Sequence, residues 1–496
     1  MMKKGSITVF LSLVMSVLLL LISICIESVR MQAARTQILN SVDIGLYSLF
    51  GQFEKTLLEE YDLFGIDSSG SGSKANISAV YSNFEGYMKP VLKQQNTQKL
   101  KLQQGGITGY QLLTDHGGEV FYQQVVQYMK DTLGSHGVDL LLDRIRDRET
   151  RTLEAELLGE ESEKKDSLNS YDAEIQAAEQ KSREVLEAQQ AGNVDENGQS
   201  YPVVVLPEQP LEPVENPIPA IKKARRRSIL DLVLSSARDI SDRSVDKHSL
   251  VSGRSLQQGM GTLQSIEYDN GYASQILFQQ YMDEKLGNFR KPAKTAGLKY
   301  EMEYVLYGKE KDRDNLKAVA ARLLIIREGV NYAGLMADSA KSAEIKAMAA
   351  AIAMGFLFPP ASVVIESALL LCWSFAESII DVRDLFDGKK VPLVKRGDQW
   401  QISLSNLIHV FDLMDSLGKN DEEGMSYEDY LQVLLLAKSK NTKVMRTMDM
   451  IEAGMRTKTG DDSFCMDSCL TALEVSVDVK ANKRKTFQTI RQYCYD

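Results

Sequence analysis

The stretch ITVFLSLVMSVLLLLISICI, residues 7–26, runs for twenty residues without a charged side chain. At the rise of an α-helix this length covers about 30 Å, which matches the hydrocarbon core of a bilayer. Its many Leu, Ile, Val and Phe side chains favour insertion into lipid. Residues 7–26 therefore predict a transmembrane helix, and residues 1–6 are a short N-terminus before it.

The charges beside this helix predict its orientation. Lys3 and Lys4 precede the helix with no acidic residue among them, so the N-terminus is expected to stay in the cytoplasm. The protein is then a single-pass protein of the cytoplasmic membrane with an extracytoplasmic body. A cleaved secretory signal is the alternative, but the run exceeds the usual core of about 7–15 residues, and residues 27–30 supply no A-x-A cleavage site.

Apolar residues continue at helical spacing beyond the anchor. Residues recurring at steps of three and four predict an amphipathic helix that leaves the bilayer and opens the first part of the extracytoplasmic domain, residues 27–142. The positions are Val29, Ala33, Ala34, Ile38, Val42, Leu46, Leu49 and Phe53.

An insertion follows this first part. Residues 143–190 are dense in Glu, Arg, Lys, Ala and Gln, which is typical of solvent-exposed helices. Six of the eleven prolines then fall between Pro202 and Pro219, where an extended linker is expected. Residues 143–220 are therefore predicted to be a charged helical and proline-rich insertion without a core of its own. They split one globular unit, whose second part is residues 221–496.

The second part predicts a helix-rich α+β fold. Alternation of apolar and polar residues predicts strands over residues 298–304 and 473–479, and a hairpin joining 391–394 to 400–404. Asp312 is expected to cap one helix, and Ser426 with Asp429 to open another. Residues 347–375 are apolar apart from Glu366, but Pro359 and Pro360 divide them into pieces too short to span. A buried helical hairpin is therefore favoured over a second membrane span.

Size and composition exclude several functions. A net charge of −10 on 496 residues argues against a nucleic-acid partner. The four histidines lie far apart, and the sequence contains no GxSxG, HExxH or Walker motif. We therefore expect no catalytic, cofactor-binding or metal-binding residues, no cofactor, and a protein that is not an enzyme. Glu366 and Glu377, in their apolar surroundings beside Trp373, are expected to face a polar partner within the fold, and a buried acid site is the alternative.

The cysteines predict one covalent link. Five cysteines are too few for a disulfide scaffold. Cys465, Cys469 and Cys494 belong to the part expected outside the membrane, where a disulfide persists. Three candidates for one bond leave the pairing open.

The N-terminal region resembles a known group of membrane anchors. KKGSITVFLSLV, followed by ESVRMQAARTQ and DIGLYSLFGQFEKTLLEEYDLFGID, is similar to the pilin-type anchors of TadE and TadG proteins, which are minor pilin-like components of the tight-adherence (Flp) pilus apparatus. The chain is most similar to an uncharacterised family of large membrane-anchored proteins found beside such loci in Gram-positive bacteria. In that family KYEMEYVLYGKEKDRDNLKAVAARLL and CWSFAESIIDVRDLFDGKKVPLVK are also expected.

The resemblance implies a processing site but also shows a departure. Prepilins are cut after the glycine that follows their basic residues, which implies cleavage between Gly5 and Ser6. The glutamate usual at the fifth mature position is Phe10 in this chain. The assembly contact made by that glutamate is therefore absent, and whether the anchor is processed stays open.

These observations lead to a functional hypothesis. The chain is expected to be a non-enzymatic structural or assembly component of a Tad/Flp-type pilus or a related secretion apparatus. Its partners would be the cytoplasmic membrane and pilin-like or Tad-type proteins, in a homo- or hetero-oligomer. The alternative is an envelope-anchored binding or sensing module unrelated to pili.

Overall fold

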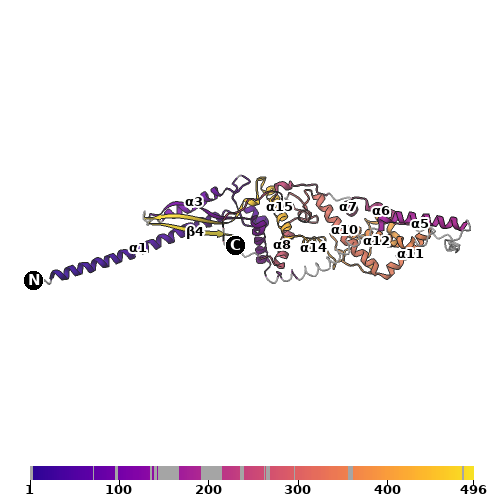
Figure 1. The fold of residues 1–496 in the computed structure, drawn as a ribbon, viewed down its shortest axis with the longest axis horizontal. Coiled ribbons are helices and arrows are strands. Elements are labelled where there is room, and N and C mark those ends of the chain that lie inside the picture. Colours follow the sequence, from indigo (N-terminus) through magenta and orange to yellow (C-terminus); the bar gives the residue numbers. More distant parts are fainter. Residues whose placement is uncertain are drawn as a thin grey trace.

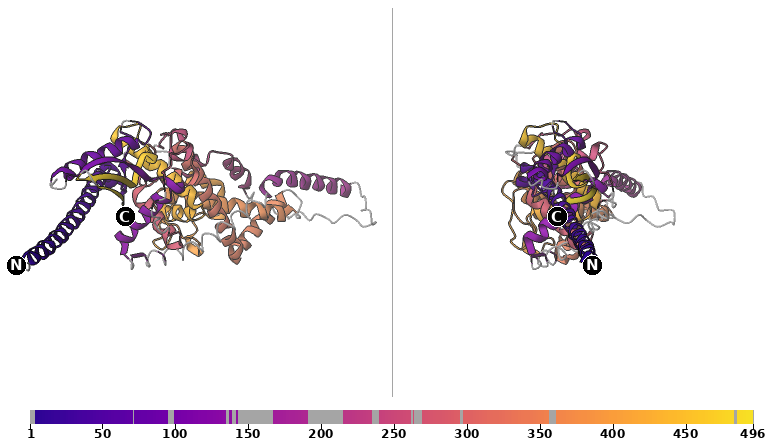
Figure 2. Two further views of the ribbon diagram at one scale, coloured as in Figure 1. Left: turned by 60° about the vertical axis from the view of Figure 1, so that its left-hand side comes forward. Right: turned by 90° about the vertical axis from the view of Figure 1, so that its left-hand side faces the viewer.

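The computed structural model describes residues 4–70, 72–94, 99–134, 137–138, 142, 167–190, 215–234, 240–261, 263, 269–294, 297–355, 361–482 and 485–495. The molecule is elongated, with the N-terminal end of α1 (Lys4–Phe50) at one end and α5 (Ser167–Gln190) and α11 (Ser339–Gly355) at the other (Figure 1). Figure 2 shows the same long axis obliquely and end-on. The fold is helix-rich α+β with a small antiparallel sheet, which confirms the predicted class.

Helix α1 has two chemically different halves. Every side chain from Ile7 to Ile26 is exposed, and this half is long and apolar enough to cross a membrane. The hydroxyl groups of Ser12 and Ser16 donate to backbone carbonyls of the preceding turn, so these side chains present no unsatisfied donor. The second half buries one stripe, which confirms the amphipathic helix from Ala34 onward, but Val29 and Ala33 of the predicted stripe are exposed and Phe53 lies beyond the end of the helix. The stripe consists of Ala34, Ile38, Val42, Leu46 and Leu49.

The sheet lies beside the second half of α1. Its central strand is β3 (Cys469–Ala481), which pairs with β2 (Lys101–Leu112) along one side. Strand β4 (Lys485–Cys494) and the short β1 (Ile66–Asp67) pair along the other side, and all these pairings are antiparallel. The predicted strand over residues 473–479 is confirmed, because its apolar residues are buried and its polar residues are only partly so.

The described residues form two hydrophobic cores. The smaller one lies between the sheet, the second half of α1 and α3 (Ile77–Gln94). Because this part adjoins the half of α1 that is long and apolar enough to cross a membrane, we call it the membrane-proximal unit. The larger core fills the helical body. The body contains α2 (Lys55–Tyr61), a helix over residues 115–134, α5, α6 (Ile218–Arg225), α7 (Ile229–Val233), α8 (Tyr272–Lys285), α9 (Glu301–Tyr307), α10 (Asp312–Ala337), α11, α12 (Ser362–Phe386), α13 (Val410–Leu413), α14 (Tyr427–Leu436) and α15 (Lys440–Thr459).

Helices α11 and α12 cover most of the second apolar stretch and pack against each other. Helix α12 is also long and apolar enough to span a membrane, but 78% of its most apolar window is buried inside the protein. A helical hairpin is thus observed, but only α12 is buried as expected, whereas α11 buries one face made of Ile345, Ala349, Ile352 and Ala353. Pro359 and Pro360 lie outside the described residues.

The predicted helix starts are only partly correct. Ser426 and Asp429 form the reciprocal capping box at the start of α14. Asp312, in contrast, is the first residue of α10 and does not cap that helix by a side-chain bond. Its carboxylate accepts hydrogen bonds from the backbone N–H groups of Lys299 and Tyr300 instead.

The predicted strand over residues 298–304 is wrong, because the chain enters helix α9 at Glu301. Alternation suggested one buried face, but Glu301 and Glu303 are as buried as their apolar neighbours. Glu301 Oε2 accepts a 2.8 Å hydrogen bond from the N–H of Gly287, and Glu303 Oε1 accepts one of 2.8 Å from the N–H of Phe289. Polar groups of neighbouring segments therefore donate to side chains that the pattern placed in solvent, although Glu303 Oε2 is buried without a hydrogen-bond partner among the described residues.

These two carboxyl groups predict a pH-dependent stability. Burial raises the pKa of Glu301 to about 8 and that of Glu303 to about 7, and the nearby Asp312 carboxylate adds to both shifts. Because the folded state then binds more protons than the unfolded state, stability should fall as pH rises from about 4.5 to 8. Replacing Glu301 by Gln should reduce this fall by a few kcal/mol, at about 1.4 kcal/mol per unit of pKa difference between the folded and unfolded states.

Denaturant unfolding of the full chain in detergent at pH 5.5 and 8.5 measures this difference. The exposed Glu310→Gln variant is the matched control and should keep the wild-type pH profile. An unchanged profile in Glu301→Gln would show that Glu301 is ionised in the folded protein.

The hairpin predicted from residues 391–394 and 400–404 is also wrong. Val391 instead forms an isolated antiparallel bridge with Met425. The rest of the segment contains the 3₁₀ helices η4 (Gly397–Gln399) and η5 (Leu404–His409). The N–H groups of Gln401 and Ile402 donate to the carboxylate of Glu377, so they are not available for a strand ladder.

The described part of the insertion contributes to the body, contrary to the expectation of a segment without a core. Helix α5 packs on α12, and its Tyr171 and Ile175 side chains are buried in the larger core. The Tyr171 hydroxyl also accepts a 3.1 Å hydrogen bond from Asn216 Nδ2. Tyr171 and Ile175 lie four residues apart, so they share one face of the helix, a pattern that the charge density of the segment concealed.

Candidate functional site

The sequence-predicted processing site lies at the start of α1, because both Gly5 and Ser6 fall within its first turns. Lys4, the basic residue before the glycine, begins the same helix. The basic, glycine and apolar segments therefore follow one another on one continuous helix. Cleavage between Gly5 and Ser6 stays a prediction.

The three cysteines of the predicted disulfide lie where the helical body meets the sheet. Cys465 precedes the 3₁₀ helix η6 (Met466–Ser468), and Cys469 opens β3. Both are buried. Cys494 ends β4 on the neighbouring strand.

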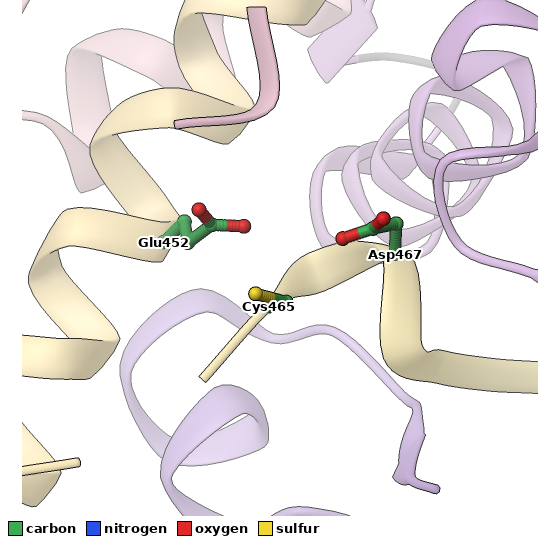
Figure 3. A group of neighbouring side chains, drawn as sticks. All are labelled: Glu452, Cys465 and Asp467. Carbon is green, nitrogen blue, oxygen red and sulfur yellow. The ribbon is translucent and has the colours of Figure 1, made fainter. Parts of the chain in front are cut away.

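Charged groups surround Cys465 in an arrangement that we call the joint cluster. Glu452 on α15 and Asp467 in η6 point toward Cys465 (Figure 3). Arg254 forms a bidentate pair with Glu452, with Nη1–Oε1 and Nη2–Oε2 distances of 2.5 and 2.8 Å. Its Nη2 also bonds Asp467 Oδ1 at 2.5 Å. Arg456, one turn along α15, donates to Glu452 Oε1 at 2.7 Å.

Backbone groups complete the joint cluster. The N–H of Met466 donates to Glu452 Oε2 at 2.8 Å, and the N–H of Gln257 donates to Asp467 Oδ2 at 2.9 Å. The loop around residue 254, helix α15 and the segment that enters β3 are therefore held by one network. Because buried charge-assisted bonds of this kind are strong and directional, the network fixes how the body meets the membrane-proximal unit.

Burial and ion pairing act in opposite directions on the pKa values of the charged groups in the joint cluster. Burial opposes ionisation of Arg254, but its pairing with Glu452 and Asp467 raises its pKa above the ordinary value. Burial raises the pKa of Glu452, and the two arginines act in the opposite direction. Burial and the adjacent Glu452 raise the pKa of the Cys465 thiol. A thiol so placed is a poor nucleophile, so the cluster does not have the chemistry of a reactive cysteine.

The donor geometry of the joint cluster argues against a metal. One ligand atom each from Glu452, Cys465 and Asp467 lie within 4.8 Å of one another. Both oxygens of Glu452 already accept hydrogen bonds from Arg254, however, and a cation would have to displace two guanidinium groups. Two arginines balance two carboxylates without a metal, so we interpret the cluster as a structural joint.

A second buried cluster lies inside the body, and we call it the buried tetrad: Arg327, Glu377, Asp381 and Lys395. Arg327 donates to Asp381 Oδ2 from Nε and Nη2 at 2.9 and 2.8 Å. Lys395 pairs with both Asp381 and Glu377. The expectation that Glu377 faces a polar partner is therefore confirmed. The tetrad attaches the segment around Lys395 to α10 and α12.

The two acids of the tetrad respond differently to this environment. Burial raises the pKa of Glu377 despite its pairing with Lys395. Burial also disfavours ionisation of Asp381, but Arg327 and Lys395 together hold its pKa below the ordinary value. Asp381 is thus the anion on which both cations depend.

Comparison with known proteins assigns a family to this architecture. A model of a family of unknown function, DUF5702, matches residues 207–481, which is more than half of the chain. The chain belongs to the DUF5702 family. No curated protein and no solved structure matches it.

The DUF5702 segment contains both charged clusters but not the anchor. It begins before α6 and ends with β3, so Arg254, Glu452 and the tetrad all lie within it. Helix α1, β2 and β4 lie outside it. The DUF5702 segment therefore covers the helical body from α6 to α15 together with the central strand β3, whereas α2, the helix over residues 115–134 and α5 lie outside it.

Sequence reasoning missed the joint cluster altogether. Arg254, which pairs with both acids, is far from the other members along the chain, since it bonds Glu452 across a separation of 198 residues. The one local signal was an acid and an arginine one turn apart on α15, Glu452 and Arg456, inside an otherwise buried helix face. Such i,i+4 pairs are also common on solvated helices, so the signal does not distinguish the two cases.

Proposed function

We propose that this DUF5702 protein is a non-enzymatic, membrane-anchored structural or assembly component of a Tad/Flp-type pilus or a related secretion apparatus. The observation that carries the proposal is the two-part character of α1. One uninterrupted helix of 47 residues exposes an apolar half and packs its other half against a sheet. A helix of this kind fixes a body rigidly to a membrane and offers its apolar half to other helices in the bilayer.

The internal chemistry is consistent with a structural role. In the described part of the chain, the charged side chains of each cluster form hydrogen bonds with other members of the same cluster and with backbone groups. The body extends away from the N-terminal end of α1 (Figure 1). If Lys3 and Lys4 keep the N-terminus in the cytoplasm, the body would project from the outer face of the membrane toward other subunits.

Site-specific photo-cross-linking in intact cells tests the proposed assembly role. A photoreactive residue at Leu19, which is 58% exposed on α1, should cross-link to a pilin-like or Tad-type membrane protein. The same residue at Val363, exposed by 68% on α12 at the far end, is the matched control and should not give that product. If Leu19 yields only lipid adducts, the rival function as an envelope-anchored binding or sensing module is favoured.

The orientation is tested separately. Protease added to wall-stripped cells should digest the body and leave a small membrane fragment that contains residues 7–26. Full protection of the body would contradict the proposed extracytoplasmic location.

Processing of the anchor gives a further prediction. If a prepilin peptidase acts on the chain, N-terminal sequencing of membrane-extracted protein should begin at Ser6, and the Gly5→Leu variant should keep its initiator region. The Ser6→Ala variant, which retains the glycine, should still be cut. A start near residue 30 would indicate ordinary secretory cleavage and would remove the anchor from the mature protein.

A further inference from the structure

The geometry around η6 distinguishes among the three candidate cysteines. Cys465 and Cys469 flank this single 3₁₀ turn, which the 3.0 Å hydrogen bond from the N–H of Ser468 to the carbonyl of Cys465 closes. The sulfur of Cys469 lies 3.9 Å from the same carbonyl oxygen. The turn therefore already brings the Cys469 thiol against the backbone of Cys465.

Cys494 occupies a different position in the sheet. Its cross-strand partner on β3 is Ala472, whereas the cross-strand partner of Cys469 is Asp67 of β1. Strand β1 therefore lies beside Cys469, at the position that Cys494 would have to occupy to form a disulfide with Cys469. Cys465 lies still further back along the chain, before β3 begins.

The surroundings of Cys465 and Cys469 leave the Cys469 side chain less room to move than the Cys465 side chain. Cys469 is packed against Gly65, where even an added Cβ would come within 3.1 Å of the Cys469 Cβ. The sulfur of Cys465 points toward the joint cluster, 3.7 Å from Arg456 Nη2. The two thiols are not bonded to each other in this structure, and a bond between them would require the Cys465 side chain to turn away from Arg456.

We propose that Cys465 and Cys469 form an intrachain disulfide as the chain folds, and that this bond closes the turn between the body and β3. The proposal rests on the proposed extracytoplasmic location, where such a bond persists. Each thiol gives up its proton, and the pair loses two electrons to a disulfide-bearing oxidant, which leaves as two thiols. The bond forms before the joint closes, since both cysteines are buried in the folded protein.

Mass spectrometry of the full chain tests the bond directly. Cells are dissolved in a denaturing detergent with an alkylating agent present and no reductant, so that buried free thiols also react, and the protein is then digested with trypsin. Residues 459–480 contain no Lys or Arg before Lys480, so Cys465 and Cys469 fall in one peptide. That peptide should be unalkylated and two hydrogens lighter than its reduced form, whereas residues 492–496 should carry an alkylated Cys494.

Two serine variants identify the bonded pair. Cys465→Ser should leave Cys469 alkylated and abolish the mass difference, whereas Cys494→Ser should preserve it. Reduction should lower the melting temperature of the wild type and of Cys494→Ser but should not change that of Cys465→Ser. Alkylation of both Cys465 and Cys469 in the wild type, or a peptide linked to Cys494, overturns the proposal.

A separate arm tests the location on which the proposal rests. A cysteine introduced at the exposed position Val363 should react with a membrane-impermeant maleimide in intact cells if the body is outside. Lack of labelling there contradicts the proposed location. Labelling at that position together with alkylated Cys465 and Cys469 contradicts the disulfide alone.

Discussion

Replacing Asp381 by Asn should destabilise the helical body by about 3–5 kcal/mol, which is the cost of breaking a buried ion pair by removing one partner. Asp381 is fully buried and accepts bonds from Arg327, Asn331 and Lys395. Asparagine keeps the shape of the side chain but removes its charge. Two buried cations would then share the single carboxylate of Glu377, and one of them would be left without a counter-charge.

Denaturant unfolding of the full chain in detergent measures this loss. The exposed Asp398→Asn variant, in the neighbouring 3₁₀ helix η4, is the control and should change stability by less than about 0.5 kcal/mol. A double variant with Arg327→Met and Asp381→Leu should lose less than Asp381→Asn, because it leaves no unpaired charge on α10 or α12. Unchanged stability in Asp381→Asn would show that the tetrad does not hold the segment around Lys395.

Replacing Arg254 by Met should disrupt the joint at a similar cost of about 3–5 kcal/mol. Methionine fills part of the volume, but Glu452 and Asp467 would keep only Arg456 as a nearby cation. Because Glu452 also receives the N–H of Met466, the segment that enters β3 should loosen with it. Limited proteolysis should therefore expose a new site near Phe464 before the body unfolds.

The matched control is Arg313→Met. Arg313 pairs with Asp242 at the surface, where both side chains are more than half exposed, so its loss should cost less than about 1 kcal/mol. Equal effects of the two substitutions would mean that the joint cluster contributes no more than a surface pair. An Arg254→Met variant with unchanged proteolysis would show that β3 is held by the sheet alone.

The sequence predicted those elements whose pattern reflects a single environment. The amphipathic half of α1, the strand over residues 473–479 and the capping box at Ser426 each have one face against a core and one toward solvent or a cap. The helical hairpin of residues 347–375 followed from proline placement. In each case local chemistry and tertiary packing favour the same conformation.

The incorrect strand and hairpin predictions involve buried polar groups whose hydrogen-bond partners are distant in the sequence. Glu301 and Glu303 made residues 298–304 appear half-exposed, although the N–H groups of Gly287 and Phe289 satisfy them inside the body. The N–H groups of Gln401 and Ile402 likewise donate to the carboxylate of Glu377, so they cannot pair in the expected hairpin. No local period encodes such contacts, because the partners are set by tertiary structure.

The membrane-proximal core joins the two ends of the chain. Ser68 Oγ, for example, donates to the carbonyl of Ser468 across 400 residues of sequence. A ribosome delivers α1, α3 and β2 first, yet their apolar faces meet β3 only after almost the whole chain has been made. During synthesis the membrane-proximal unit therefore exposes the hydrophobic surface that β3 later covers, while the body can already fold. A chain truncated before Cys469 would remain in that state permanently, and it would present a target for chaperones and proteases.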